Sequence, residues 1–209
     1  MQILLIAATK DEIGPEFYKY PGIDVLITGP GIPSTMYHLQ KRMQQIDYEF
    51  ILQAGIAGTF TEDIDLGQVV LVKQDTFGDL GMEDKENFTS IFDSGLCNKD
   101  EFPFKNGWLV NTNKIFEQPD LTDVKAISVN KVSESLLQKQ QLIKRFDPGI
   151  ESMEGAALHY VCLQENIPFL QLRSISNYVG ERDKEKWKTK EAINNLNTEL
   201  TKLISRLVQ

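Results

Sequence analysis

The sequence predicts an α/β fold, because segments with strand character alternate with segments whose apolar residues recur at helical spacing. The first apolar run, residues 3–7, is nearly continuous, which is typical of a strand covered on both faces. In the last segment, residues 193–207, leucine and isoleucine follow a period of 3.6, which predicts an amphipathic helix packed on the sheet. The chain of 209 residues has no internal repeat or linker, so we expect a single domain over residues 1–209.

The beginning of the chain contains three predicted strands that each run into a turn of small or polar residues. These strands are residues 3–7, 25–27 and 50–52. The turn Thr28-Gly29-Pro30-Gly31 exposes backbone amides, and Ser34 can cap a helix that continues to about Asp47. Ligands of open α/β sheets bind beyond the carboxyl ends of the strands, so we expect the three turns to share one crevice.

The middle of the chain is less regular. We expect a strand at residues 69–72, after which periodicity is lost until about residue 105. Long irregular segments in compact domains are usually functional or mobile, so residues 73–105 are expected to border the site. Strand character returns at residues 124–129, and residues 133–146 are predicted to form a helix with one apolar side.

The stretch from Gly149 to Asn177 carries the strongest functional pattern. Glu154 precedes Gly155-Ala156-Ala157 and an apolar run, which predicts the start of a tightly packed helix. Phe169–Ile175 then predicts a strand that runs out into Asn177. Because this strand ends beside a helix start, we expect Glu154 and Asn177 to face one cleft.

The composition argues against several classes of partner and site. A formal net charge of −8 disfavours nucleic acid and anionic membrane surfaces as partners. Cys97 and Cys162 are too few for a disulfide framework, so a reducing, cytoplasmic location is expected. No stretch approaches the ~20 apolar residues of a transmembrane helix, and residues 1–8 lack the basic start of a signal peptide. His38 and His159 belong to no metal-binding motif, so we expect neither metal nor cofactor.

Short motifs along most of the chain carry a resemblance to a known family. They are Ala7–Glu12, Gln53–Gly58, Gly67–Val72, Met153-Glu154 and Arg173–Ser176. Together they resemble the purine nucleoside phosphorylase and nucleosidase superfamily, which includes the methylthioadenosine nucleosidases. Within it, Phe77–Gly81 and Ser176–Val179 are most similar to the futalosine hydrolases, nucleosidases of menaquinone biosynthesis. The resemblance implies a three-layer α/β/α fold around a mixed, twisted sheet.

This resemblance also implies how the residues share the chemistry. Cleavage of an N-ribosidic bond leaves positive charge on the sugar, so the enzyme needs a base for water, a group near the cation and help for the departing purine. Glu12 matches the residue that activates water, and Glu154 matches the carboxylate that binds two ribose hydroxyls. From position alone, either acid could instead stabilise a helix amino terminus.

Asn177 bears on the substrate. Family members that act on adenine nucleosides typically have an aspartate here, which protonates N7 of the purine. An amide can donate a hydrogen bond to N7 but cannot deliver a proton. The substitution favours a 6-oxopurine such as hypoxanthine, whose base leaves more readily with negative charge than adenine does.

Further site residues follow from the same resemblance. Positions that tend to line the base pocket are matched by Ala57, Gly58, Val129 and Val132. Met153 matches a residue on the sugar face, and Arg173 matches the arginine that braces Glu154. Core packing is the alternative for the valines and the methionine, and a structural ion pair is the alternative for Arg173.

The implied function is hydrolysis of futalosine to hypoxanthine and dehypoxanthine futalosine by a homodimer. Phosphorylases of the superfamily carry arginine and serine where this chain has Gln53 and Ile56, so water is the expected nucleophile. The alternatives are a methylthioadenosine/adenosylhomocysteine nucleosidase, a purine nucleoside phosphorylase and a non-catalytic nucleoside-binding protein. Asp79 and Glu83 are further candidates for supporting the site. Lys131 and Arg182 are candidates for binding the benzoate-like tail of futalosine.

Overall fold

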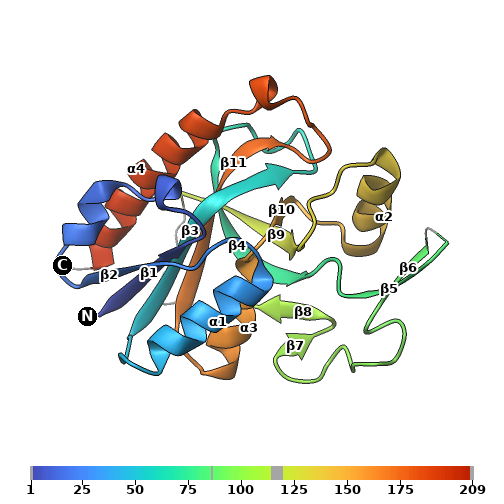
Figure 1. Ribbon diagram of the computed structural model, residues 1–209, viewed down its shortest axis with the longest axis horizontal. Helices are drawn as coiled ribbons and strands as arrows, with labels where there is room; N and C mark the ends of the chain where they lie inside the picture. Colours follow the sequence, from blue (N-terminus) through green and yellow to red (C-terminus); the bar gives the residue numbers. More distant parts are fainter. Residues whose placement is uncertain (1, 86, 114–119, 208–209) are drawn as a thin grey trace.

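A computed structural model of the protein describes residues 2–85, 87–113 and 120–207, and it has a mixed sheet between two layers of helices (Figure 1). The strands of this sheet are β1 (Ile3–Ala7), β2 (Ile23–Ile27), β3 (Phe50–Thr59), β4 (Val69–Phe77), β7 (Phe104–Lys105), β8 (Trp108–Val110), β9 (Thr122–Ser128), β10 (Ile150–Ser152) and β11 (Phe169–Tyr178). The helices are α1 (Ile32–Met43), α2 (Leu136–Phe146), α3 (Gly155–Gln164) and α4 (Thr189–Leu207), with short 3-10 helices η1 (Lys10–Glu12), η2 (Pro15–Lys19) and η3 (Lys184–Lys186). The strands β5 (Gly81–Asp84) and β6 (Asn87–Ser90) form a separate hairpin. The predicted three-layer α/β fold is confirmed.

The sheet closes on itself in its middle part. The strand order is β2-β1-β3-β10-β9-β4-β8-β7, and β11 pairs with both β3 and β4. β11 runs parallel to β3 and antiparallel to β4, so β3, β10, β9, β4 and β11 form a ring of paired strands. Because β11 has a neighbour along each edge, its residues from Phe169 to Ser176 are all buried. Polar side chains on this strand therefore lie inside the molecule.

The two faces of the sheet build separate cores. Alternate residues of β1 point to opposite faces, as the pleat requires, so Leu5 packs in one cluster and Leu4 in another. The first cluster includes the apolar stripe of α4, and the second lies under α1 and α3, which pack against each other (Figure 1). None of the helices within the described residues is long and apolar enough to cross a membrane.

Both expected ends of α1 and the expected start of α2 differ from the structure. Helix α1 begins at Ile32, because Gly31 takes the N-cap position with φ of 89°, whereas the hydroxyl of Ser34 donates to Thr28 O at 2.5 Å. It also ends at Met43, before the predicted Asp47. Helix α2 is capped by Ser135, whose side chain accepts a hydrogen bond from Gln138 N, so it begins later than the predicted residue 133.

The segment predicted to be irregular is partly regular. β4 continues to Phe77, and β5 (Gly81–Asp84) pairs antiparallel with β6 (Asn87–Ser90). The extension of β4 escaped the sequence pattern because Asp75 and Thr76 are polar and nevertheless buried, at 0% and 1% exposure. The short strands β7, β8 and β10 were also missed, because two or three residues carry too little periodicity.

Candidate active site

Glu12 lies in η1, in the turn directly after β1, and its side chain is buried. Its Oε2 accepts hydrogen bonds from the amide and the hydroxyl of Thr9, at 2.8 and 3.1 Å, and its Oε1 accepts from Ile56 N on β3 at 3.2 Å. The side chain of Asn197 on α4 fixes the same turn, donating to Glu12 O at 3.0 Å and accepting from Gly14 N at 2.7 Å. The carboxylate is thus held in one orientation by backbone and side-chain donors.

Glu154 is the N-cap residue of α3 and is also buried. Its Oε1 accepts from Gly31 N at 3.2 Å, and its Oε2 accepts from Arg173 Nη1 on β11 at 3.3 Å. The exposed amide predicted in the glycine turn therefore binds this carboxylate. Each oxygen takes one hydrogen bond from the described part of the chain, which leaves a second acceptor position on each for a ligand.

Gly55 on β3 brings the two carboxylates together. A Cβ atom on this residue would lie 2.3 Å from Arg173 Nη1 and 3.0 Å from Glu12 Oε1. Arg173 is only 1% exposed and pairs with Glu154, and its Nη2 donates to Gln53 Oε1 at 3.2 Å. Glu12, Arg173 and Glu154 therefore form one contiguous group over the small-residue strand.

Asn177 lies farther along the same pair of strands. A β-bulge at Ser176 shifts the register, so that Asn177 pairs with Gly58 while Arg173 pairs with Gly55. Bulges redirect side chains and are frequent beside active sites. At a strand rise of about 3.3 Å per residue, three positions on β3 separate the amide from the carboxylate group by roughly 10 Å. This separation is comparable in length to a ribose joined to a purine.

The amide of Asn177 is oriented by its neighbours. Ser176 Oγ donates to Asn177 Oδ1 at 2.7 Å, and Asn177 Nδ2 donates to Tyr178 O at 2.9 Å. The Nδ2 atom also lies 3.2 Å from the position that a Cβ on Gly58 would occupy. An amide nitrogen has two hydrogens, so one donor position is available to a ligand.

The other predicted pocket residues are divided between core and surface. Ala57 and Val129 are buried in core clusters, at 5% and 1% exposure, whereas Val132 is 37% exposed. Gly58 and Met153 are half-buried. Val129 therefore packs in the core, which was the alternative to a place in the base pocket. Val132 lies on the loop between β9 and α2.

Two carboxylates that frame this site hold the loop that carries Val132. Asp79 Oδ2 accepts from the amides of Asn130 and Lys131, at 2.6 and 3.4 Å. Glu151 accepts from Ser133 N at 2.9 Å and from the Ser133 hydroxyl. Burial raises the pKa of Glu151, and the nearby negative charge of Asp79 raises it further, while the bonds from Ser133 lower it.

The remaining candidates lie outside the carboxylate group. Arg182 pairs with Glu134 at 3.3 Å, and its Nη2 donates to Val132 O at 3.5 Å, so this guanidinium helps to hold the loop. Lys131 is exposed, and Glu83 lies on β5, whose residues are all exposed. Sequence reasoning passed over Glu151 because no motif marks it.

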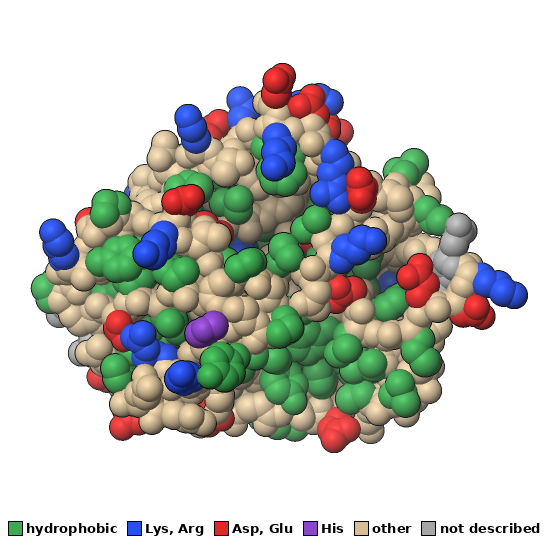
Figure 2. Space-filling model, viewed as in Figure 1, with side chains coloured by type: hydrophobic (Ala, Val, Ile, Leu, Met, Phe, Trp, Pro, Cys, Tyr) green, Lys and Arg blue, Asp and Glu red, His purple; other side chains and the backbone are tan. Residues whose placement is uncertain are grey.

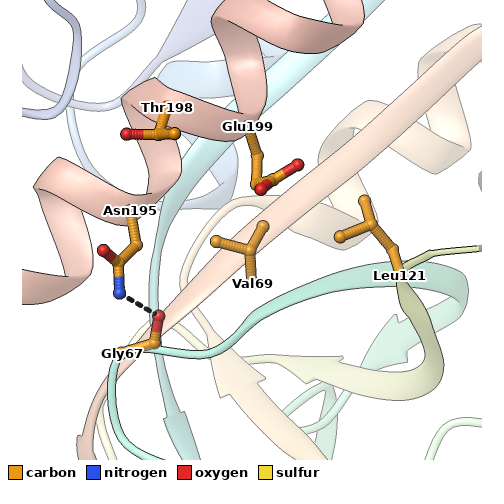
Figure 3. A pocket seen from close by; sticks show the side chains of 6 residues that line it. All are labelled: Gly67, Val69, Leu121, Asn195, Thr198 and Glu199. Atoms are coloured by element: carbon orange, nitrogen blue, oxygen red, sulfur yellow. Dashed lines mark hydrogen bonds between the residues drawn. The ribbon is translucent and has the colours of Figure 1, made fainter.

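Two cavities lie apart from these residues. One, of about 230 Å³, lies between α4 and the start of β4, where Asn195 Nδ2 donates to Gly67 O at 2.8 Å (Figure 3). The other, of about 740 Å³, is lined by Phe102, Cys162 and Phe169, among others. Neither is lined by a residue predicted for the site.

The fold is the one expected for a nucleoside-cleaving class, and comparison with known families agrees. Residues 16–209 match the family described as the Phosphorylase superfamily, so the chain belongs to this family.

Among curated proteins, the chain is similar to two futalosine hydrolases. It is 29% identical to that of Thermus thermophilus over 192 residues, which cover 90% of this chain and 83% of the relative. It is 26% identical to that of Streptomyces coelicolor over 158 residues, covering 75% of this chain and 65% of the relative. The predicted resemblance to futalosine hydrolases is confirmed.

Solved structures show the same fold. The futalosine hydrolase of Helicobacter pylori superposes with a TM-score of 0.81 at 16% identity, covering 99% of this chain and 98% of that chain. A mutant 5'-methylthioadenosine/S-adenosylhomocysteine nucleosidase of the same species, with 5'-methylthioadenosine in its active site, has a TM-score of 0.80 at 17% identity and covers 98% of each chain.

Proposed function

We propose that this protein is a nucleosidase that hydrolyses the N-ribosidic bond of futalosine, releasing hypoxanthine and dehypoxanthine futalosine as a step of menaquinone biosynthesis. The observation that carries the proposal is the contiguous group of Glu12, Arg173 and Glu154 over Gly55. The similarity to two futalosine hydrolases supports this choice of substrate.

The two acids take different roles because their surroundings differ. Glu12 accepts the proton of the attacking water, whose oxygen bonds to the anomeric carbon. Glu154 has one acceptor position left on each oxygen, which suits two neighbouring ribose hydroxyls. Its negative charge also stabilises the positive charge that develops on the sugar. Arg173 keeps this carboxylate in place from inside the protein.

The purine leaves with the electron pair of the broken bond. Asn177 donates a hydrogen bond to N7, which stabilises the negative charge on a 6-oxopurine without delivering a proton. The base then takes its proton from solvent. Because an amide in this place gives adenine less help, adenine nucleosides are poorer substrates.

Water is the nucleophile in this proposal because the phosphate ligands of phosphorylases are replaced. Gln53 is 2% exposed, and its Oε1 accepts from Arg173. Ile56 uses its backbone amide to hold Glu12. Both positions therefore serve the carboxylates, and the rate of cleavage should not depend on phosphate.

We also propose that the protein acts as a homodimer in the cytoplasm. Large apolar side chains are exposed on the segment between β4 and β8 and on α1: Leu80, Met82, Leu96 and Phe102, at 44%, 51%, 71% and 67%, and Tyr37, at 61%. On the face drawn in Figure 2, hydrophobic side chains gather over β7 and β8. Light scattering of Phe102→Glu against the parent protein tests whether this surface holds two copies together.

The test of the reaction is hypoxanthine release from futalosine by the pure protein, measured with and without phosphate. Methylthioadenosine, adenosylhomocysteine and inosine serve as competing substrates. We expect hypoxanthine release that is indifferent to phosphate. Adenine release that exceeds hypoxanthine release would favour the methylthioadenosine nucleosidase reading, and strict dependence on phosphate would favour a phosphorylase.

A further inference from the structure

A polar cluster lies beneath the first turn of α3, on the protein side of Glu154. It comprises Asp75 on β4, Ser128 on β9, His159 on α3 and Gln171 on β11, and each of the four is 0% exposed. Buried polar groups are costly, so a cluster of this kind requires a reason. The reaction proposed above uses none of these residues directly.

The cluster reaches the helix start through hydroxyl groups. Ser128 Oγ donates to Asp75 Oδ1 at 3.0 Å and accepts from Ala156 N at 2.8 Å. Ser152 Oγ, 3.3 Å from Ser128 Oγ, accepts from Gly155 N at 3.4 Å. The first amides of a helix have no partner within the helix, and here the serines supply one. Asp75 therefore fixes, through one hydroxyl, the residues that follow Glu154.

The polar cluster lies very close to the backbone of Gly155, the first residue of α3. A Cβ on this glycine would lie 2.1 Å from Gln171 Nε2 and 2.2 Å from Asp75 Oδ2. Any side chain would displace these groups, which explains a glycine at the first position of α3. The helix start and Asp75 are in direct contact.

The charges around Asp75 link it to Glu154. Burial raises the pKa of Asp75 to about 7, while the positive charge of Arg173 and the hydrogen bond from Ser128 act in the opposite direction. The facing groups on other elements are Arg173 and Gln171 of β11, Ser128 of β9 and His159 of α3. Burial lowers the pKa of His159 to about 4, so this ring is neutral at pH 7. Arg173 is therefore the cation that faces both carboxylates.

We propose that Asp75 is a positioning residue for Glu154. It fixes the first turn of α3 through Ser128, and as a second carboxylate beside Arg173 it governs how far that guanidinium neutralises Glu154. The role of Glu154 toward ribose rests on the proposed function. When Asp75 is ionised, Arg173 is shared between two carboxylates, and more of the negative charge of Glu154 is available to the cationic sugar.

The kinetic test compares kcat and KM across pH for the parent, D75N and S128A, with Val161→Ala as a control that loses packing on α3 without touching the cluster. In the plot of kcat against pH, the parent should show a rise near pH 7, in addition to the rise at lower pH that forms the acid limb. D75N keeps an acceptor for Ser128 but loses the charge, so it should lose this rise and fall about fivefold in kcat above pH 8, with KM changed less. S128A and V161A should keep the rise.

Hydrogen exchange of the ligand-free protein tests the positioning independently of activity. In S128A and D75A, the amide of Ala156 should exchange about tenfold faster, while amides in the last turn of α3 keep their rates. In D75N the exchange should resemble that of the parent. If no variant cleaves a nucleoside, the proposed function fails, and the exchange still decides the positioning.

Two results would overturn the inference. One is a pH profile of D75N that keeps the rise seen in the parent. The other is an Ala156 amide whose exchange is the same in S128A, D75A and the parent. Should D75A fail to fold, S128A and D75N still give both readouts.

Discussion

Replacing Asp75 by asparagine should stabilise the protein increasingly as the pH rises. Burial raises the pKa of this carboxyl from 3.8 to about 7, so the folded state holds a proton that the unfolded state loses between these values. The parent protein therefore loses stability as pH increases through this window, and the loss is complete above the folded pKa. D75N has no such group.

The magnitude follows from the shift. A shift of three pKa units, at about 1.4 kcal/mol each, changes the free energy of unfolding by at most about 4 kcal/mol. By proton linkage, the parent loses roughly 2 kcal/mol of this stability between about pH 5.5 and 8.5, a range in which both proteins can be handled. A fixed effect of the amide on hydrogen bonding cancels when the two pH values are compared.

The assay is urea unfolding of the parent and D75N at both pH values. The free energy of unfolding of D75N relative to the parent should be larger at the higher pH by roughly 2 kcal/mol. Asp11→Asn, an exposed acid in η1, is the control and should show no such change. A difference between D75N and the parent that is constant, or that shrinks with pH, would refute the reasoning.

Three further changes test the site. Glu12→Gln should lower kcat by a factor of about 10²–10⁴, because the amide keeps the shape of the side chain but loses its basicity. Calorimetry should show that futalosine still binds to this variant. Asp11→Asn is the control, and its kinetics and calorimetry should match those of the parent. Asn177→Asp should shift the ratio of kcat/KM values toward adenine nucleosides by about tenfold or more, and an unchanged ratio would remove the argument for a 6-oxopurine. Gly55→Ala should lower kcat/KM by about 100-fold, since a Cβ 2.3 Å from the buried guanidinium displaces it, while Gly149→Ala, whose nearest contact would be 3.4 Å, should stay active.

The sequence predicted well those elements that have a strong apolar period. β1 follows its expected range because it is a continuous apolar run. α4 contains the whole expected range of residues 193–207, which carries a regular apolar stripe, but it begins earlier, at Thr189. β4 was shortened in the prediction, since its buried Asp75 and Thr76 resemble surface residues. A local pattern cannot distinguish a polar residue that is solvated from one that is buried inside a closed sheet.

The candidate site residues were chosen from the resemblance to a known family, and the structure adds how they lie relative to one another. Glu12 and Glu154 are far apart in the sequence, and the glycine of β3 and the guanidinium of Arg173 lie between them in the structure. The Asp75 cluster could not be predicted, because its members come from four separate elements and form no motif. One local signal was present in Gly155, a glycine at a helix start, where the structure leaves no space for a side chain.

The most direct test of the account is a crystal structure of the Glu12→Gln protein with futalosine bound. The account predicts that the two ribose hydroxyls lie within hydrogen-bonding distance of the two oxygens of Glu154 and that N7 of the hypoxanthine faces Asn177 Nδ2. A nucleoside bound in the cavity beside α4, or one whose ribose leaves Glu154 without contact, would contradict it.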